Sequence, residues 1–368
     1  MINGYCEEKY NPIKKIFESY FLKQEEIGAS FAIYKEGKPL IDLYGGFKNK
    51  NNNNNWEENT IVNVFSATKG IYEIIVSILI DQNILDLEKS VSYYWNAFKQ
   101  SNKREIKLKH ILSHQSGLYR FKEIITQEDL LDWNKIITIL ENQEPDHPCG
   151  ERTYYHAKTH GFLIGEIVKK ATNKSLGEIT SELLSKKLNL DFFIGTPKKK
   201  LSNIAFLYED KKESKISAEF NAFNNPEHEI NFYNKENWQI AEVPSMNGHG
   251  NARSIAKIYD FFVNDLILEK NILLSKSSIK KCLAESSNRI DESLMLLIRW
   301  SKVGLILRSG WLFGKNKESF GHNGWGGSLG FADPVLGVGI SYTTNRINPT
   351  MSSDLRIINL LKEFYKLY

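Results

Sequence analysis

The chain has 368 residues, of which 41% are hydrophobic, 12% aromatic and 25% charged. It is long enough for two or three lobes and apolar enough to bury a core, which excludes a peptide-sized module and a wholly disordered chain. Lys and Arg number 48 against 44 Asp and Glu, so the net charge is +4. Because this excess is spread along the chain, it gives no reason to expect a nucleic-acid partner.

The cysteines and the N-terminus bear on the compartment. The three cysteines lie far apart, at Cys6, Cys149 and Cys282. They suggest neither a disulfide framework nor a thiolate metal site, and a reducing compartment fits them best. Residues 1–15 are rich in charge and lack the apolar core of a signal peptide. The longest apolar run, 71–80, is too short to cross a membrane. We therefore expect a cytoplasmic protein without a membrane span.

The N-terminal third alternates helical and strand patterns. Apolar residues at helical spacing predict an amphipathic helix over 13–21. Two β-rich runs, 29–34 and 39–44, are separated by a short Gly-containing turn and predict a hairpin. The polar tract 51–55 is expected to be an exposed loop tip. Apolar spacing over 71–79 then predicts a helix that is apolar around much of its circumference and hence central.

The middle of the chain is predicted to be helical. Helical patterns occur at 106–112, 130–140 and 159–171. Residues 195–238 show no clean period, so we expect long loops there that partly cover a cleft. These features predict a mainly helical lobe over 86–244.

Strand patterns return in the last third, after a helix predicted over 254–268. The predicted strands are 303–307, 309–313, 319–322, 328–332 and 337–343. A helix over 352–365, started by Ser352, Ser353 and Asp354, closes the chain. Strands near both ends with helices between them predict an α+β protein, in which 1–85 and 245–368 form an α/β lobe closed by both termini.

Ser66-Ala67-Thr68-Lys69 is the first motif that can carry chemistry. Its spacing places Lys69 one turn from Ser66 on the same helical face. A desolvated Lys is an established base for a Ser nucleophile, and a helix N-terminus favours negative charge developing there. Taken alone, however, the tetrad fits an N-cap serine with a surface lysine better.

Two further segments change that balance. The segment 151–161 contains two tyrosines before a helical run, and a tyrosine there could shuttle a proton to a leaving group. Residues 320–327, Phe-Gly-His-Asn-Gly-Trp-Gly-Gly, lie on a late strand whose glycines allow a ligand to lie close to the backbone.

With these motifs the sequence resembles the serine β-lactamase and penicillin-binding-protein superfamily, and most closely its family VIII carboxylesterases. The resemblance covers nearly the whole chain. It is carried by the hairpin 28–46 and the segments 64–70, 108–118, 155–157, 247–250 and 321–327. It implies the β-lactamase/transpeptidase-like fold, with an antiparallel sheet flanked by helices.

The resemblance also implies the roles of individual residues. Ser66 corresponds to the acylated nucleophile, Lys69 to its general base and Tyr155 to the tyrosine of the second motif. The oxyanion hole would be formed by the backbone N–H groups of Ser66 and Trp325. The implied substrate-binding residues are His322, Asn323, Gly324, Gly326 and Gly327. No cofactor or metal is implied, and the expected partner is a small-molecule ester.

Two departures favour esters over β-lactams as substrates. The tyrosine motif ends in Ala157 where many β-lactamases have Asn, and His322 stands where penicillin-recognising relatives have Lys. Because a His is only partly cationic near neutral pH, it is a weaker anchor for a β-lactam carboxylate. Lys158 or Arg253 could supply the missing cation. The prediction is a serine hydrolase of small carboxylic esters; the alternatives are a β-lactamase or D-amino-acid peptidase, or a catalytically silent scaffold.

Two competing signals remain. Residues 326–330 match the G-x-S-x-G nucleophile elbow around Ser328, but that motif requires a helix after the turn, and a strand is predicted instead. The histidines form two (i, i+4) pairs, His110 with His114 and His156 with His160. Without a third ligand or an adjacent Glu, we expect structural or cleft-lining roles for them and no metal site.

Overall fold

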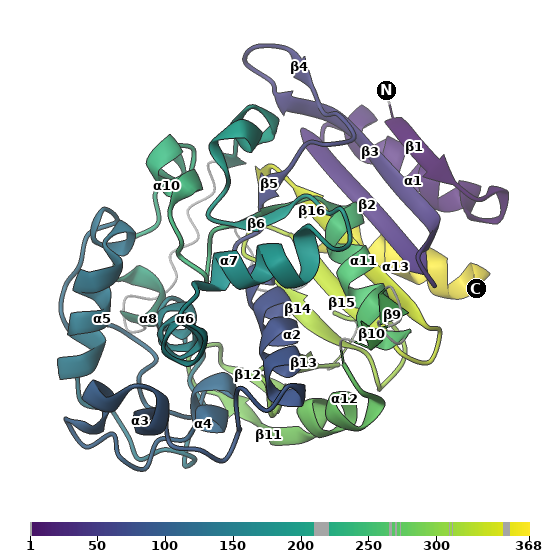
Figure 1. The fold of residues 1–368 in the computed structure, drawn as a ribbon. Coiled ribbons are helices and arrows are strands. Elements are labelled where there is room, and N and C mark those ends of the chain that lie inside the picture. The colour runs from purple at the N-terminus through teal and green to yellow at the C-terminus, as the bar shows by residue number, and fades with distance from the viewer. Residues whose placement is uncertain are drawn as a thin grey trace.

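A computed structural model describes residues 2–209, 221–264, 267–268, 271–272, 274–308, 310, 312–348 and 354–368. Its main feature is an antiparallel sheet built from both ends of the chain (Figure 1). In spatial order its strands are β1 (Ile2–Cys6), β3 (Lys38–Asn49), β2 (Gly28–Lys35), β16 (Val338–Thr344), β15 (Leu329–Asp333), β14 (Phe320–Asn323), β13 (Ile306–Leu307), β12 (Leu296–Ser301) and β11 (Glu285–Asp291). The short β4 (Asn54–Asn55) pairs with β3.

Helices cover both faces of this sheet. Alternate side chains of β2 point to opposite faces, so Phe31 and Ile33 join one core cluster while Ala32 and Tyr34 join another. The first face packs against α1 (Asn11–Leu22) and α13 (Leu355–Leu367), and the second against α11 (Ala252–Val263). This explains why β2 is almost continuously apolar rather than alternating.

The central helix α2 (Ala67–Asp81) packs against β14 and β15. It is buried along its whole length except its last residue. A three-stranded sheet lies at its start, formed by β5 (Val62–Asn63), β8 (Gly248–Gly250) and β6 (Phe192–Ile194). The helix thereby carries its first turn to the junction between the large sheet and the helical region.

The helical region occupies the middle of the chain and lies to one side of the large sheet (Figure 1). Its helices are α3 (Val91–Tyr94), α4 (Leu108–Leu112), α5 (Trp133–Asn142), α6 (Thr159–Thr172), α7 (Leu176–Thr180), α8 (Asn221–Asn224), α9 (Ile230–Tyr233) and α10 (Glu236–Ile240). The remaining elements are α12 (Lys276–Leu283) and two small strand pairs, β7 (Tyr208–Glu209) with β17 (Arg346–Ile347) and β9 (Ile267–Leu268) with β10 (Asn271–Ile272). The division into two lobes at 86 and 244 stays a prediction.

Several predicted boundaries are corrected by the structure. The helix predicted over 254–268 ends at Val263, and 267–268 belong to β9. The strand predicted over 303–307 shrinks to β13, because a turn at Gly304 with φ of +96° precedes it. The strand predicted over 309–313 is wrong at its described residues 310, 312 and 313, which lie in turns. Residues 309 and 311, and the predicted helix start at 352–353, lie outside the described residues.

Candidate active site

Ser66 lies immediately before α2, on a sharp turn. The preceding residue, Phe65, has φ of +45°, in the left-handed region that non-glycine residues rarely adopt. Its ring is held edge-on by Trp325, with the ring centroids 5.1 Å apart, and by Tyr233 at 5.3 Å. Strained backbone of this kind persists only where packing over-determines it. The turn therefore holds Ser66 firmly at the N-terminus of the helix.

Lys69 is fully buried one turn further along α2. Its Nζ lies 3.2 Å from Ser66 Oγ and donates to the carbonyl oxygens of Ala157 and Ser245, both at 2.9 Å. Burial lowers the pKa of Lys69 to about 7, and the nearby Glu73 opposes this shift. Burial also raises the pKa of Glu73 well above its usual value. Desolvation thus favours the neutral forms of both side chains, and a neutral Lys69 can accept the Ser66 proton.

Tyr155 faces the same amine. Lys69 Nζ lies 5.0 Å from the centre of the Tyr155 ring. The ring stacks on Trp300 at 5.9 Å, and the backbone N–H of Tyr155 donates to Asp291 Oδ1 at 3.0 Å. Burial raises the pKa of Tyr155, which a hydrogen bond with Ser66 opposes. The side chain is therefore a neutral phenol at physiological pH and is able to give up a proton to a stronger base.

The end of β14 forms the opposite wall of the site. Gly324 is required there, because a Cβ atom would lie 2.1 Å from the carbonyl oxygen of Val64. This close approach brings Trp325 beside the turn that carries Ser66. Within the described part of the chain, the backbone N–H groups of Ser66 and Trp325 donate to no other group. Two such free donors beside a nucleophile suit an oxyanion.

These residues line a pocket of about 110 Å³. Its wall comprises Phe65, Ser66, Tyr155, Ala157, Lys158, Phe223, His228, Met246, Leu294, Leu296, Ile298, Ile306, Leu312, His322, Asn323, Gly324 and Trp325. Most of these side chains are apolar, and few polar groups converge on Ser66. The pocket therefore suits a small, largely apolar substrate.

Comparison with known proteins identifies the family. A family model described as beta-lactamase matches residues 13–362. The chain belongs to the β-lactamase family. This finding confirms both the resemblance noted in the sequence and the predicted β-lactamase/transpeptidase-like fold.

Members with solved structures show the same fold over their full length. A family VIII carboxylesterase is 32% identical with a TM-score of 0.93, and 100% of each chain is covered. A penicillin-binding-protein homologue from Caulobacter crescentus is 28% identical, with the same TM-score and coverage. Among curated proteins, the esterase/β-lactamase LipL of Mycobacterium tuberculosis is 25% identical over 95% of this chain and 85% of its own.

Gly326 and Gly327, two of the predicted substrate-binding residues, are not among the residues that line the pocket. A Cβ atom on Gly326 would lie 2.6 Å from Ile347, and one on Gly327 would lie 2.7 Å from Asp354. The Gly326 carbonyl accepts from Arg356 Nη2 at 3.5 Å. The structure thus gives both glycines a packing role, and their contact with substrate stays a prediction.

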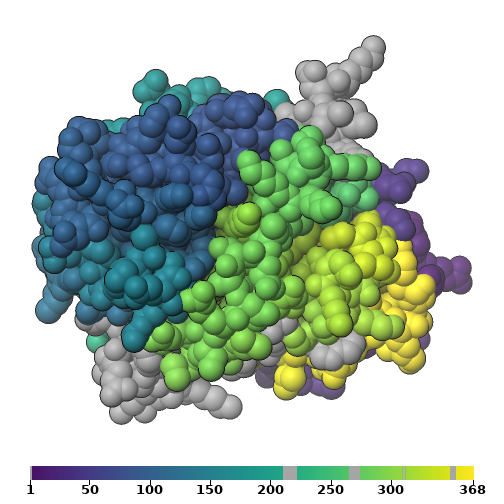
Figure 2. Space-filling model, turned by 90° about the horizontal axis from the view of Figure 1, so that it is seen from below, coloured from purple at the N-terminus to yellow at the C-terminus, as the bar shows by residue number. Residues whose placement is uncertain are grey.

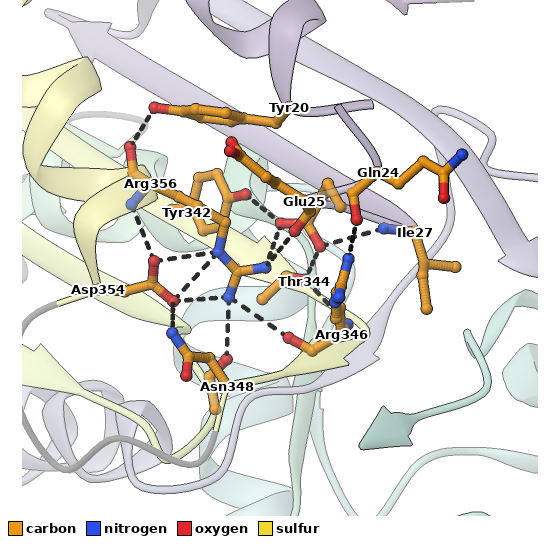
Figure 3. A network of polar contacts seen from close by, with 12 residues as sticks. Tyr20, Gln24, Glu25, Ile27, Tyr342, Thr344, Arg346, Asn348, Asp354 and Arg356 are labelled. Carbon is orange, nitrogen blue, oxygen red and sulfur yellow. Dashed lines mark hydrogen bonds and ion pairs between the residues drawn. The ribbon is translucent and has the colours of Figure 1, made fainter. Parts of the chain in front are cut away.

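The guanidinium of Arg356 belongs to a buried polar network (Figure 3), which reaches the loop after Trp325 through the Gly326 carbonyl. It pairs with Glu26 at 2.7 Å and with Asp354 at 2.6 Å. Tyr342 and Thr344 donate to the same Glu26 carboxylate. One guanidinium here faces two carboxylates, and burial raises the pKa of Glu26, which favours its neutral form. The network ties α13 to the sheet and to the loop after Trp325.

His322 carries no charge in this site. Burial and the nearby Lys69 lower its pKa to about 3, so the side chain is neutral, where the sequence suggested partial charge. The two cations considered as substitutes differ in position. Arg253 is paired with Asp42 and Glu58, away from the pocket lining, whereas Lys158 is buried in the pocket wall.

Lys158 and His228 are polar pocket residues that the motifs did not assign. Lys158 Nζ donates to the carbonyl oxygens of Phe223, at 2.7 Å, and Pro226, and burial lowers its pKa to about 7. His228 stacks on Trp325 with the ring centroids 4.9 Å apart. Both contacts involve residues 221–233, a segment distant in sequence from the motifs. No motif or spacing in the sequence therefore predicts that Lys158 and His228 line the pocket.

The other candidate residues lie away from the pocket lining. Ser328 is absent from the pocket lining, and the strand β15 follows it in place of a helix. His114, His156 and His160 cluster in the core, where burial lowers the pKa of each. Among the described residues, no group of His, Cys, Asp and Glu side chains could hold a metal ion. The described helices include none long and apolar enough to cross a membrane.

Proposed function

We propose that the chain hydrolyses small carboxylic esters through an acyl-enzyme on Ser66. The observation that carries this proposal is the buried Lys69 amine, 3.2 Å from Ser66 Oγ, in surroundings that favour its neutral form. The proposal is also supported by the membership of the chain in the β-lactamase family and by its similarity to a family VIII carboxylesterase.

In the first step, Ser66 Oγ attacks the ester carbonyl carbon and its proton passes to Lys69. The carbonyl oxygen becomes an oxyanion, which the N–H groups of Ser66 and Trp325 stabilise. The C–O bond to the alcohol then breaks. The departing alkoxide takes the Tyr155 proton, which Lys69 replaces. Water repeats the sequence on the acyl-enzyme, releasing the carboxylic acid and restoring Ser66.

Esters are favoured over β-lactams because the neutral His322 offers no charge to a substrate carboxylate. Losing a charge-assisted hydrogen bond costs about 1.5 to 3 kcal/mol, which corresponds to roughly ten- to a hundredfold in transition-state binding. Asn323 and Gly324 line the pocket, which supports the prediction that they contact the ester. The alternative of a β-lactamase or D-amino-acid peptidase rests on Lys158, the one cation besides Lys69 near the described pocket.

Labelling with a fluorophosphonate tests the nucleophile. The probe should label Ser66, so labelling should disappear in Ser66→Ala and persist in Ser328→Ala. Peptide mapping after intact-protein mass measurement identifies the modified serine. Labelling that survives Ser66→Ala but is lost in Ser328→Ala would overturn the assignment, and an unlabelled wild-type protein would favour the silent scaffold.

Substrate class is tested by comparing kcat/KM for nitrophenyl butyrate and a chromogenic cephalosporin. The ester should be the far better substrate. A cephalosporin value equal to or above that for the ester would sink the esterase proposal. Lys158→Met then shows whether Lys158 is the anchor, since cephalosporin turnover would fall in that variant.

We also propose a cytoplasmic location, on the basis of the cysteines. All three are free: Cys6 and Cys149 are partly buried and Cys282 is fully buried. Free thiols are typical of a reducing compartment. Fractionation of the native host, with detection of the protein by antibody, checks this proposal.

A further inference from the structure

The apolar lining of the pocket falls into two groups, which pack with different core clusters. In the first group, Trp325 packs with the core cluster that contains Phe65 and Met246. In the second group, Tyr155 belongs to another core cluster, against which Leu294, Ile298 and Leu312 pack. We call these the Trp325 half and the Tyr155 half. An ester bound at Ser66 places its acyl group in one half and its alcohol in the other.

The proposed chemistry decides which group goes where, so this inference rests on the proposed function. The ester oxygen leaves as an alkoxide and must take its proton from the Tyr155 phenol. Proton transfer requires the two oxygens to lie within about 3 Å of each other. The alcohol therefore departs through the Tyr155 half, and the acyl group is left in the Trp325 half.

The outer wall of the Tyr155 half is one face of β12 and of the turn before it. Side chains of a strand alternate between its two faces, so Leu296, Ile298 and Trp300 share a face. Trp300 stacks on Tyr155, while Ile298 and Leu296 line the pocket. The wall thus extends from Tyr155 along Ile298 to Leu296, and the exposed fraction of these β12 residues rises from buried Trp300 to Leu296, which is 47% exposed.

The opposite face of β12 does not line the pocket. Arg299 pairs with Glu285 on β11, and Leu297 is 54% exposed. In Figure 2 the segment that contains both strands forms a green band between the blue helical region and the yellow C-terminal region. Leu296 and Leu297 are therefore a matched pair of half-exposed leucines on opposite faces of one strand.

We propose that the Tyr155 half selects esters of extended apolar alcohols, whose chains lie along Ile298 and Leu296. Burying a methylene group on this wall favours the transition state, and the advantage increases with chain length until the wall ends. Polar groups are missing from the β12 part of the wall, so a sugar or amino alcohol gains nothing there. The natural substrate is accordingly a small ester with an apolar alcohol chain long enough to reach Leu296.

Two substrate series test this proposal with the full chain. The first varies the alcohol, from ethyl to octyl acetate, and the second varies the acyl group, from nitrophenyl acetate to octanoate. Hydrolysis is followed by pH-stat titration for the first series and by absorbance for the second. Along the alcohol series, kcat/KM should increase about threefold for each methylene that is buried, and at least about tenfold overall. Along the acyl series, kcat/KM should increase much less.

The leucine pair locates the effect on β12. Leu296→Ser should lower the ratio of kcat/KM for octyl acetate to that for ethyl acetate by about fivefold. Leu297→Ser should leave this ratio unchanged. Melting curves show whether each variant is folded, and since both side chains are half exposed, we expect both to fold.

Every outcome decides the proposal. Hydrolysis of nitrophenyl acetate with no rise along the alcohol series overturns this inference and leaves the esterase proposal standing. A steep rise along the acyl series instead reverses the assignment of the two halves and also overturns it. If Leu296→Ser and Leu297→Ser change the octyl-to-ethyl ratio of kcat/KM equally, the β12 face with Leu296 does not bind the alcohol chain, and the proposal is wrong. If the folded wild-type protein hydrolyses none of these esters, the proposed function itself is wrong.

Discussion

Mild acid should lower the rate of hydrolysis by protonating Lys69. At its usual pKa of 10.5, only about 1 in 3000 lysines is neutral at pH 7. With burial lowering the pKa of Lys69 to about 7, about half are neutral. Because the neutral amine is the species that accepts the Ser66 proton, kcat/KM should be flat above pH 8. It should be roughly tenfold lower at pH 6 than on that plateau.

The assay is the initial rate of nitrophenyl butyrate hydrolysis at low substrate concentration between pH 6 and 9. Two other groups need controls, Lys158 in the pocket wall and Asp291 on the backbone N–H of Tyr155, because burial also brings the pKa of each to about 7. Lys158→Met and Asp291→Asn should both keep the inflection. Return to pH 8 should restore the rate fully. An inflection near 10, or one that disappears in either control variant, would refute the role given to Lys69.

Further perturbations test other parts of the structure. Lys69→Ala should lower kcat at least about a hundredfold, the scale expected for loss of a positioned base, as measured with nitrophenyl butyrate. Gly324→Ala should lower kcat by about 10²- to 10³-fold with little change in KM, because the added Cβ displaces the Trp325 N–H from the oxyanion; wild-type kinetics in this variant would contradict the placement. EDTA should leave the rate unchanged, and a loss that added metal restores would contradict this. Five buried histidines should make the fold acid-labile: His114, His156, His160, His249 and His322. Their pKa values are lowered in the folded protein, so the stability they provide is present above the unfolded pKa of about 6.5 and decreases below it. Each loses about 1.4 kcal/mol at pH 5.5, which urea unfolding at pH 7.5 and 5.5 would measure; equal stability at both would show that the histidines are charged in the fold.

The sequence predicted the parts of the site that lie close together in the chain. Ser66 and Lys69 are three residues apart, and Tyr155 and residues 322–325 lie in recognisable short motifs. Helices and strands with clear periodicity, such as 13–21 and 29–34, were also confirmed. These features depend on local spacing, which a sequence displays directly.

Features that depend on contacts between distant segments were missed. Strands β11 and β12 went unpredicted because 285–291 is polar and 294–298 is apolar on both faces, so neither run alternates. The sequence offered Lys158 only as one of two possible cations, because its contacts with the carbonyl groups of Phe223 and Pro226 involve a distant segment. The neutrality of His322 likewise comes from burial, which no motif reveals.

The pairing of β2 with β16 has a consequence for synthesis of the protein. It joins residues near 30 to residues near 340 in the middle of the large sheet. A ribosome adds about 5 to 20 residues per second, so the edge of β2 waits roughly 15 to 60 s for its partner. An apolar, unpaired strand edge is a template for association with other chains. The yield of active enzyme in a cell should therefore depend on chaperones that cover the N-terminal hairpin during that interval.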